Sequence, residues 1–138
     1  MEKQAKLLLV DDDPDFIKST TVILESQAYE VITAKDGLEC LEKIKEDPPD
    51  LIILDLLMPK LDGFGVVREL KENPRYAKYD DIPILILTAV REDASRRRYE
   101  LETGLEMDVD DYVEKPVQPA ELLHRVGKLL EKKREERR

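Results

Sequence analysis

Five polar residues stand at the ends of segments that the sequence predicts to be strands: Asp11 and Asp12, Asp55, Thr88 and Lys115. Carboxylates that converge on a small volume repel one another unless a divalent cation lies among them. Because no cluster of His or Cys accompanies them, these oxygen ligands favour Mg²⁺. A lysine and a hydroxyl beside such a cation suit an incoming phosphoryl group. One carboxylate can then act as the nucleophile, which gives an aspartyl phosphate.

Asp55 is the central residue of this pattern, because it directly follows the apolar run LIIL at positions 51–54. A run that apolar indicates a strand buried on both faces and ending in a loop. Open α/β sheets bind their ligands beyond the carboxyl ends of such strands. Asp55 alone could equally be a loop-capping aspartate, so its assignment depends on the other strand ends.

Strands and helices are predicted to alternate along the chain. Apolar runs predict strands at 6–10, 29–34, 51–54, 82–89 and 111–116, and helices are predicted from Pro14, from Gly37, at 63–73, at 92–103 and from Pro119. This alternation indicates an α/β fold of the flavodoxin-like, doubly wound (βα)5 type, with a five-stranded parallel sheet of order 2-1-3-4-5. In that order the polar strand ends lie side by side.

Several local features are also predicted. Asp13 is a candidate N-cap for the first helix, and the segment 75–81 is expected to be a polar connector. Cys40 is expected to be a small buried residue, and His124 a surface or half-buried residue of the last helix. The second helix is expected to carry three apolar side chains on one side: Leu38, Leu41 and Ile44.

Composition restricts the class of protein. The chain has 138 residues, of which 41% are hydrophobic and 40% charged, and its net charge is −9, which indicates one globular domain. The negative charge argues against nonspecific affinity for nucleic acid or membranes. The one cysteine, Cys40, excludes an intrachain disulfide and fits a reducing cytoplasm, the expected location. No apolar stretch approaches the ~20 residues that a membrane-spanning helix needs.

Four strand-end motifs occur in order: Val10-Asp11-Asp12-Asp13, Leu54-Asp55-Leu56-Leu57-Met58-Pro59 with Asp62-Gly63, Leu87-Thr88-Ala89, and Tyr112-Val113-Glu114-Lys115-Pro116. Together they resemble the receiver domain of two-component response regulators, in its single-domain, chemotaxis-type form. Each motif alone is weak, but the ordered set is specific. We expect a receiver domain at 1–130, followed by a charged helical extension or tail at 131–138.

The resemblance implies the chemistry of the site. Asp55 matches the phosphoacceptor, which would accept a phosphoryl group in a Mg²⁺-dependent reaction. Asp12 would bind Mg²⁺ directly and Asp11 through water, with Asp55 and the backbone carbonyl of Leu57 as further ligands. No other cofactor is implied. The domain would assist its own phosphoryl transfer and autodephosphorylation without being an enzyme for a separate substrate.

The resemblance also implies a switch. Thr88 would bind the phosphoryl group and move toward it, and Lys115 would pair with it beside a Lys115-Pro116 bond that resembles the family's cis peptide. Tyr112 matches the aromatic residue that turns inward on activation. The face of the fourth helix, fifth strand and fifth helix would then contact a downstream protein.

The resemblance further indicates the partners. Because His124 lies in the last helix, away from the acidic strand ends, the phosphohistidine must come from a histidine kinase or phosphotransfer protein. No direct contact with nucleic acid or membrane is expected. The chain would be a monomer or a phosphorylation-linked dimer.

Other interpretations stay open at this point. Asp11 and Asp12 could be helix caps, Thr88 and Lys115 ordinary strand and surface residues, and Tyr112 plain core. A phosphatase of the haloacid-dehalogenase type also uses an aspartate nucleophile with Mg²⁺, but its Asp-x-Asp motif would need an acid where Leu57 stands. A nucleotide-binding switch lacks its Gly-x-x-x-x-Gly-Lys-Ser/Thr loop. A pseudo-receiver would be a pure interaction module, and a stand-alone receiver cannot be told from a fragment.

The chain also departs from the family pattern. The segment between Thr88 and Lys115 is longer than usual, with an apparent insertion at 106–109, and Val117 stands where Phe is frequent. The predicted fourth helix carries three consecutive arginines, which are either a solvated face or part of the output surface. These arginines are Arg96, Arg97 and Arg98. The departures concern the output face and leave the phosphorylation motifs intact.

Overall fold

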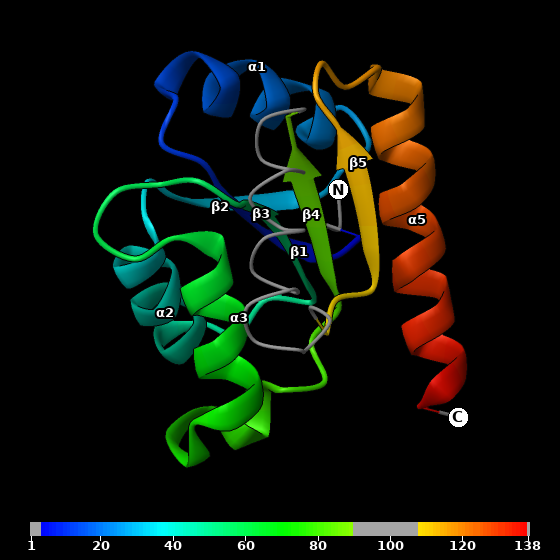
Figure 1. Cartoon of the computed structure of the whole chain (residues 1–138). Helices are drawn as coiled ribbons and strands as arrows, with labels where there is room; N and C mark the ends of the chain where they lie inside the picture. The colour runs from blue at the N-terminus through cyan, green and yellow to red at the C-terminus, as the bar shows by residue number, and fades with distance from the viewer. Residues whose placement is uncertain (1–3, 90–107, 138) are drawn as a thin grey trace.

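The computed structural model describes residues 4–89 and 108–137, which form a parallel sheet flanked by helices (Figure 1). The strands are β1 (Lys6–Val10), β2 (Glu30–Ala34), β3 (Leu51–Asp55), β4 (Ile84–Thr88) and β5 (Asp111–Glu114). The helices are α1 (Pro14–Glu25), α2 (Gly37–Glu46), α3 (Gly63–Glu72) and α5 (Pro119–Glu136), with a 3₁₀ helix, η1 (Pro74–Tyr79), before β4. The helix predicted at 92–103, with its arginines 96–98, lies outside the described residues.

The sheet has the predicted order, β2-β1-β3-β4-β5, and all neighbouring strands are parallel. At the carboxyl end of the central strand, Leu54 pairs with Val10 of β1, and Asp55 pairs with Leu87 of β4. The prediction of a flavodoxin-like, doubly wound topology is therefore confirmed. It places the end of β3 between the ends of its two neighbours.

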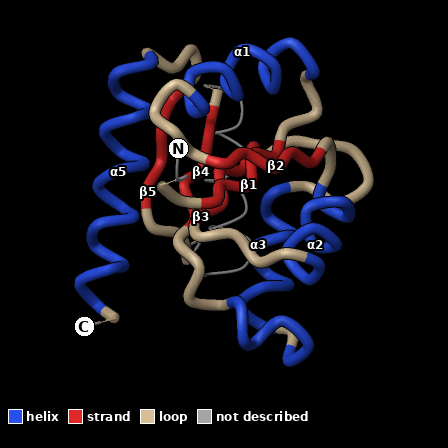
Figure 2. Tube along the Cα trace, turned by 180° about the vertical axis from the view of Figure 1, so that it is seen from behind, coloured by secondary structure: helices blue, strands red, loops and turns tan. Residues whose placement is uncertain are grey.

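Two hydrophobic layers lie on opposite faces of the sheet, because successive strand residues point to opposite faces. Leu8, Ile52 and Ile84 belong to the layer covered by α2, α3 and η1. Leu7 and Ile53 belong to the layer covered by α1 and α5. Figures 1 and 2 show these two helix pairs on either side of the sheet from opposite views.

Aspartates begin three of the helices close to the carboxyl edge of the sheet. Asp13 accepts a hydrogen bond from the backbone N–H of Asp15 at 3.0 Å, as the sequence predicts. Asp36 accepts one from Glu39 at 2.9 Å, and Asp62 accepts one from Gly65 at 2.9 Å. These caps satisfy N–H groups that have no partner inside the helix and fix where each helix leaves its strand.

The apolar side of α2 that the sequence indicates coincides only in part with its buried face. Leu38 is 51% exposed, whereas the buried residues of α2 are Gly37, Cys40, Leu41 and Ile44. The buried set has the spacing i, i+3, i+4, i+7 of a helix face. Because the first residue of the buried face is a glycine, the side defined by Leu38, Leu41 and Ile44 is rotated relative to that face.

The segment 75–81 is not simply the polar connector that its composition suggests. It contains most of η1, whose Tyr76 and Tyr79 are 8% and 7% exposed and pack into the α2–α3 layer. Residues three apart lie on one side of a 3₁₀ helix, which has three residues per turn. Both rings therefore reach the core from a polar stretch.

Strands β4 and β5 are shorter than predicted. Both predicted segments included a proline, Pro83 or Pro116, which lacks the N–H that a strand ladder uses. Helix α5 continues past residue 130 to Glu136, so the segment 131–136 is helical. In the described part of the chain, no helix is both long enough and apolar enough to cross a membrane.

Two side chains outside the strand ends lie as predicted. Cys40 is buried on α2, where burial and then the charge of Asp36 raise the pKa of its thiol to about 12. It is therefore a neutral core residue at physiological pH. His124 is exposed on α5.

Candidate functional site

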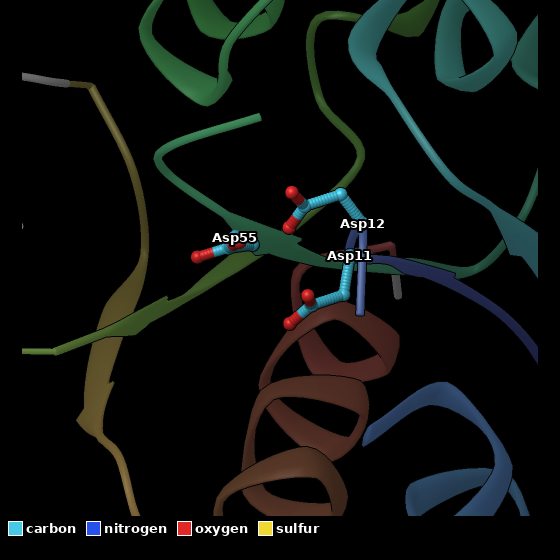
Figure 3. Close-up of side chains that lie close together, drawn as sticks. All are labelled: Asp11, Asp12 and Asp55. Carbon is cyan, nitrogen blue, oxygen red and sulfur yellow. The ribbon is translucent and has the colours of Figure 1, made fainter. Parts of the chain in front are cut away.

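Three acidic residues converge at the carboxyl edge of the sheet. Asp11 and Asp12 directly follow β1, and Asp55 is the last residue of β3. One carboxylate oxygen from each residue lies within 4.8 Å of the others (Figure 3). Asp11 and Asp55 are 1% and 2% exposed, whereas Asp12 is exposed. The cluster is therefore buried on one side and open to solvent at Asp12.

Lys115 brings positive charge to this cluster from the loop after β5. Its Nζ lies 2.7 Å from Oδ2 of Asp11 and 3.5 Å from Oδ1 of Asp55. The ammonium also lies 4.6 Å from the centre of the Phe16 ring on α1, a cation–π contact. The bond between Lys115 and Pro116 is cis, as the resemblance implies.

Hydrogen bonds hold the Asp11 carboxylate in place. Its Oδ1 accepts the backbone N–H of Asp13 at 3.0 Å, and its Oδ2 accepts a hydrogen bond from Lys115. Since Asp13 also caps α1, the turn between β1 and α1 positions Asp11 and the helix together. The Asp11 carboxylate is thus buried and held in place by hydrogen bonds, whereas the neighbouring Asp12 is exposed to solvent.

The loop that follows Asp55 packs closely on the end of β3. The backbone N–H of Gly63 donates to the carbonyl of Leu56 at 2.8 Å. A Cβ at Gly63 would lie only 2.5 Å from the carbonyl oxygen of Asp55, so this position requires glycine. Leu57, the predicted carbonyl ligand, lies half-buried in this loop.

The two predicted switch residues lie on neighbouring strands. Thr88 is the last residue of β4 and pairs with Glu114 of β5, so its backbone reaches the same edge as Asp55. The side chain of Thr88 lies outside the described part of the structure. Tyr112 pairs with Ile86 and packs, partly buried, against the α2–α3 layer. Their switching roles stay predictions.

The donor set fits a small divalent cation. Three carboxylates supply hard oxygen ligands, and the buried pair would otherwise hold like charges close together. The same donors also suit Ca²⁺, but the compact grouping with one lysine favours the smaller, phosphate-binding Mg²⁺. The chemistry that this arrangement supports is transfer of a phosphoryl group to a carboxylate.

The structure adds contacts that the sequence pattern did not indicate. Phe16 packs against the layer covered by α1 and α5, and its ring also contacts the Lys115 ammonium. Lys60 lies in the loop after β3, with its Nζ 3.7 Å from Oδ2 of the buried Asp36. No local spacing signals either contact, because each joins segments far apart in the chain.

Known proteins share this chain's sequence and fold. The chain matches the family described as response regulator receiver domain over residues 7–127. It is 44% identical over 125 residues to the probable transcriptional regulator ycf27 of Cyanophora paradoxa, covering 91% of this chain and 48% of that protein. It is 40% identical over 125 residues to the alkaline phosphatase synthesis transcriptional regulatory protein PhoP of Bacillus subtilis (strain 168), with coverages of 91% and 48%.

A solved structure supports the same assignment. A putative response regulator from Chloroflexus aurantiacus J-10-fl matches with a TM-score of 0.78 and 34% identity, covering 93% of this chain and 98% of that one. By contrast, the chain spans about half the length of the curated relatives it matches. The matches thus include a solved chain of comparable length and proteins that are longer, and the single-domain expectation stays a prediction.

Proposed function

This chain belongs to the response regulator receiver domain family, and on that premise we propose that Asp55 accepts a phosphoryl group from a phosphohistidine of a histidine kinase or phosphotransfer protein. The observation that supports this most is the position of Asp55: it is 2% exposed at the end of the central strand. Its carboxylate lies within 4.8 Å of Asp11 and Asp12 oxygens, and 3.5 Å from the Lys115 ammonium. The same geometry would serve autodephosphorylation.

In the proposed transfer, a carboxylate oxygen of Asp55 attacks phosphorus. The new O–P bond forms as the N–P bond of the donor phosphohistidine breaks, and the leaving imidazole keeps the electron pair and takes up a proton from water. Lys115, now on Asp11, would turn its ammonium toward a phosphoryl oxygen. The side chain needs only a short shift, because it already lies between the two carboxylates.

Four groups would hold Mg²⁺: Asp12 directly, Asp11 through water, Asp55, and the backbone carbonyl of Leu57. When bound there, the cation would supply positive charge that offsets the charge of the phosphoryl oxygens. The hydrogen bonds of Asp11 to Asp13 and Lys115 suit its indirect role, and the exposure of Asp12 suits a direct one.

The phosphatase alternative has less support. The residue two positions after Asp55 is Leu57, a half-buried apolar side chain, where that class needs a carboxylic acid to protonate its leaving group. Without that acid, the leaving group of a separate substrate would not be protonated, and the aspartyl phosphate would be lost only by autodephosphorylation. We therefore propose that the domain acts on itself and has no separate substrate to turn over.

Phosphorylation by acetyl phosphate tests the assignment. Wild type should gain one phosphoryl group by intact mass in the presence of Mg²⁺ and none after chelation. Asp55→Asn should gain none and keep its melting temperature or raise it. Asp50→Asn is the matched control, since Asp50 precedes the same strand at its opposite end, and it should behave as wild type. A phosphopeptide mapped to another residue of the wild-type protein would overturn the proposal.

We further propose that phosphorylation draws Thr88 inward and that Tyr112 occupies the space it leaves. The face formed by β5, α5 and the helix that the sequence predicts at 92–103 would then contact a downstream protein. The positions of Thr88 at the end of β4 and Tyr112 on β5 support this. Amide exchange with and without beryllofluoride, a phosphoryl mimic, tests it. Changes centred on residues 88–112 are expected. Changes confined to 11–13 and 55–59 would contradict the switch.

The same proposal includes the cellular setting. The chain would act in the cytoplasm, as a monomer or as a dimer linked to phosphorylation. With its net charge of −9, it would make no direct contact with nucleic acid or membranes. Two matched relatives are named transcriptional regulators, and this chain covers 48% of each.

A further inference from the structure

The loop between β3 and α3 is held from outside by the N-terminus of α2. The backbone N–H of Gly37 donates to the carbonyl oxygen of Leu61 at 2.9 Å. A Cβ at Gly37 would lie 2.2 Å from that oxygen and 2.8 Å from the Leu61 carbonyl carbon. Backbone atoms on both sides make this approach, so no side chain could move aside. The contact therefore requires glycine at position 37.

A charged contact reinforces this approach. Asp36 is 3% exposed, and while its Oδ1 caps α2 at Glu39, its Oδ2 lies 3.7 Å from the Nζ of Lys60. Lys60 has a φ of 68°, in the left-handed region that non-glycine residues rarely adopt. The loop thus makes a tight turn where it meets α2. We call the contacts of Asp36 with Lys60 and of Gly37 with Leu61 the loop latch.

The other end of the loop is fixed on the phosphoacceptor strand. Gly63 donates to Leu56 at 2.8 Å and leaves no room for a Cβ against the backbone of Asp55. The loop 56–62 is therefore attached at one end to β3 and at the other to the start of α2. Leu57 lies between these attachments, two residues after Asp55. Its backbone position depends on both.

We propose that Asp36 and Gly37 are positioning residues for the phosphorylation site. By holding the loop 56–62, the latch places the Leu57 carbonyl for the divalent cation and so sets the cation affinity of the acidic cluster. The inference rests on the proposed function for its role in phosphoryl transfer. Both residues contact the loop directly, through Leu61 and Lys60, so the proposed effect on the cluster is transmitted through the loop. Changes to groups that orient metal ligands typically lower metal affinity by roughly 10- to 100-fold.

Gly37→Ala tests the latch. The Mg²⁺ concentration that gives half-maximal phosphorylation by acetyl phosphate should rise roughly tenfold or more, while the rate at saturating Mg²⁺ stays close to that of wild type. Amide exchange of residues 56–62 without Mg²⁺ should become faster. Gly127→Ala is the matched control, because its new Cβ would meet nothing closer than the Tyr29 hydroxyl at 3.9 Å; it should change neither quantity.

A second, milder variant tests the latch in case Gly37→Ala does not fold. Asp36→Asn keeps an oxygen for the helix cap but removes the charge that faces Lys60, whose side chain is 62% exposed. The half-saturating Mg²⁺ concentration should therefore rise by only about two- to fivefold, as for an exposed ion pair. Val126→Ala, a buried change on α5 in the opposite layer, should lower the melting temperature without altering Mg²⁺ dependence. It separates positioning from general destabilisation.

The outcomes distinguish the latch from the proposed function. Suppose that the wild-type protein is phosphorylated. If Asp36→Asn and Gly37→Ala then show the Mg²⁺ dependence of wild type, and its amide exchange in residues 56–62, the latch has no positioning role. If wild type takes up no phosphate, the proposed function fails. The Mg²⁺-dependent rise in melting temperature and the amide exchange then still decide whether the latch governs cation binding.

Discussion

The two ends of the sheet differ in how their charged residues are paired and how far they are exposed to water. At the amino end, the Lys6 ammonium pairs with the carboxylate of Asp47, and the backbone N–H of Lys6 donates to Asp50 at 2.8 Å. The side chains of Lys6 and Asp47 are 25% and 52% exposed. The paired charges at this end are of opposite sign, and both side chains remain in contact with water.

At the carboxyl end, three carboxylates lie within 4.8 Å of one another, and Lys115 approaches two of them. Asp11 and Asp55 are almost completely buried. The residue types are those of the amino end, but here negative charge exceeds positive charge where water is excluded. Such an arrangement lowers stability until a cation binds. The comparison shows that an excess of buried like charge, more than the presence of ion pairs, marks the functional end.

The largest expected effect comes from removing the lysine of the buried end. Lys115→Met should lower the free energy of unfolding by about 1–3 kcal/mol, because the buried Asp11 carboxylate loses a charged hydrogen-bond donor. Urea denaturation without divalent cations measures the change. Saturating Mg²⁺ should restore part of the loss. Unchanged stability in this variant would show that the two ends do not differ energetically.

A smaller effect of opposite sign is expected from Asp12→Ala. Removing one like charge should raise the stability of the cation-free protein by up to ~1 kcal/mol, since Asp12 is exposed and its repulsion is screened. The rise in melting temperature with added Mg²⁺ should disappear. Asp47→Ala at the amino end is the control and should keep that rise. Equal Mg²⁺ shifts in wild type and Asp12→Ala would argue against direct ligation.

The smallest effect is expected at the amino end. Its hydrogen bond with Asp47 raises the pKa of Lys6 above 10.5, so the pair stabilises the fold below that pH and its contribution is lost as pH rises through the raised pKa. Lys6→Met should therefore lower the melting temperature slightly at neutral pH and not at all once Lys6 is deprotonated. High salt should also remove the difference. A Mg²⁺-dependent change in this variant would be unexpected.

Much of the fold and the acidic cluster follows from local sequence patterns. Each strand is a short apolar run, and a polar residue directly after the run must lie at the sheet edge. The alternation of strands and helices indicates a parallel sheet. In such a sheet the strand order alone predicts that Asp11, Asp12 and Asp55 lie close together. The cis bond before Pro116 came from the family resemblance.

The remaining features depend on contacts between distant segments. Leu38 shares one apolar side of α2 with Leu41 and Ile44, whereas the buried face begins at Gly37, which packs against the Leu61 backbone. Tyr76 and Tyr79 lie in a polar stretch of sequence. Their burial was not predicted, because only a 3₁₀ turn places both side chains on the same side of the chain. The loop latch was not predicted for the same reason. The packing of Gly37 depends on Leu61, which is distant in the sequence and close only in the folded chain.

The strand order also has a consequence for how the chain is made. The strands that carry the three carboxylates, β1 and β3, are both complete by residue 55, whereas Lys115 follows β5. The chain is synthesised from its N-terminus, so β1, β2 and β3, which pair with one another in the sheet, are made before the last two strands. Pairing of these three strands during synthesis would bring the negative charges together before the lysine that faces them has been made. We expect a divalent cation to substitute for that lysine during synthesis, so the ion that serves signalling would also assist assembly.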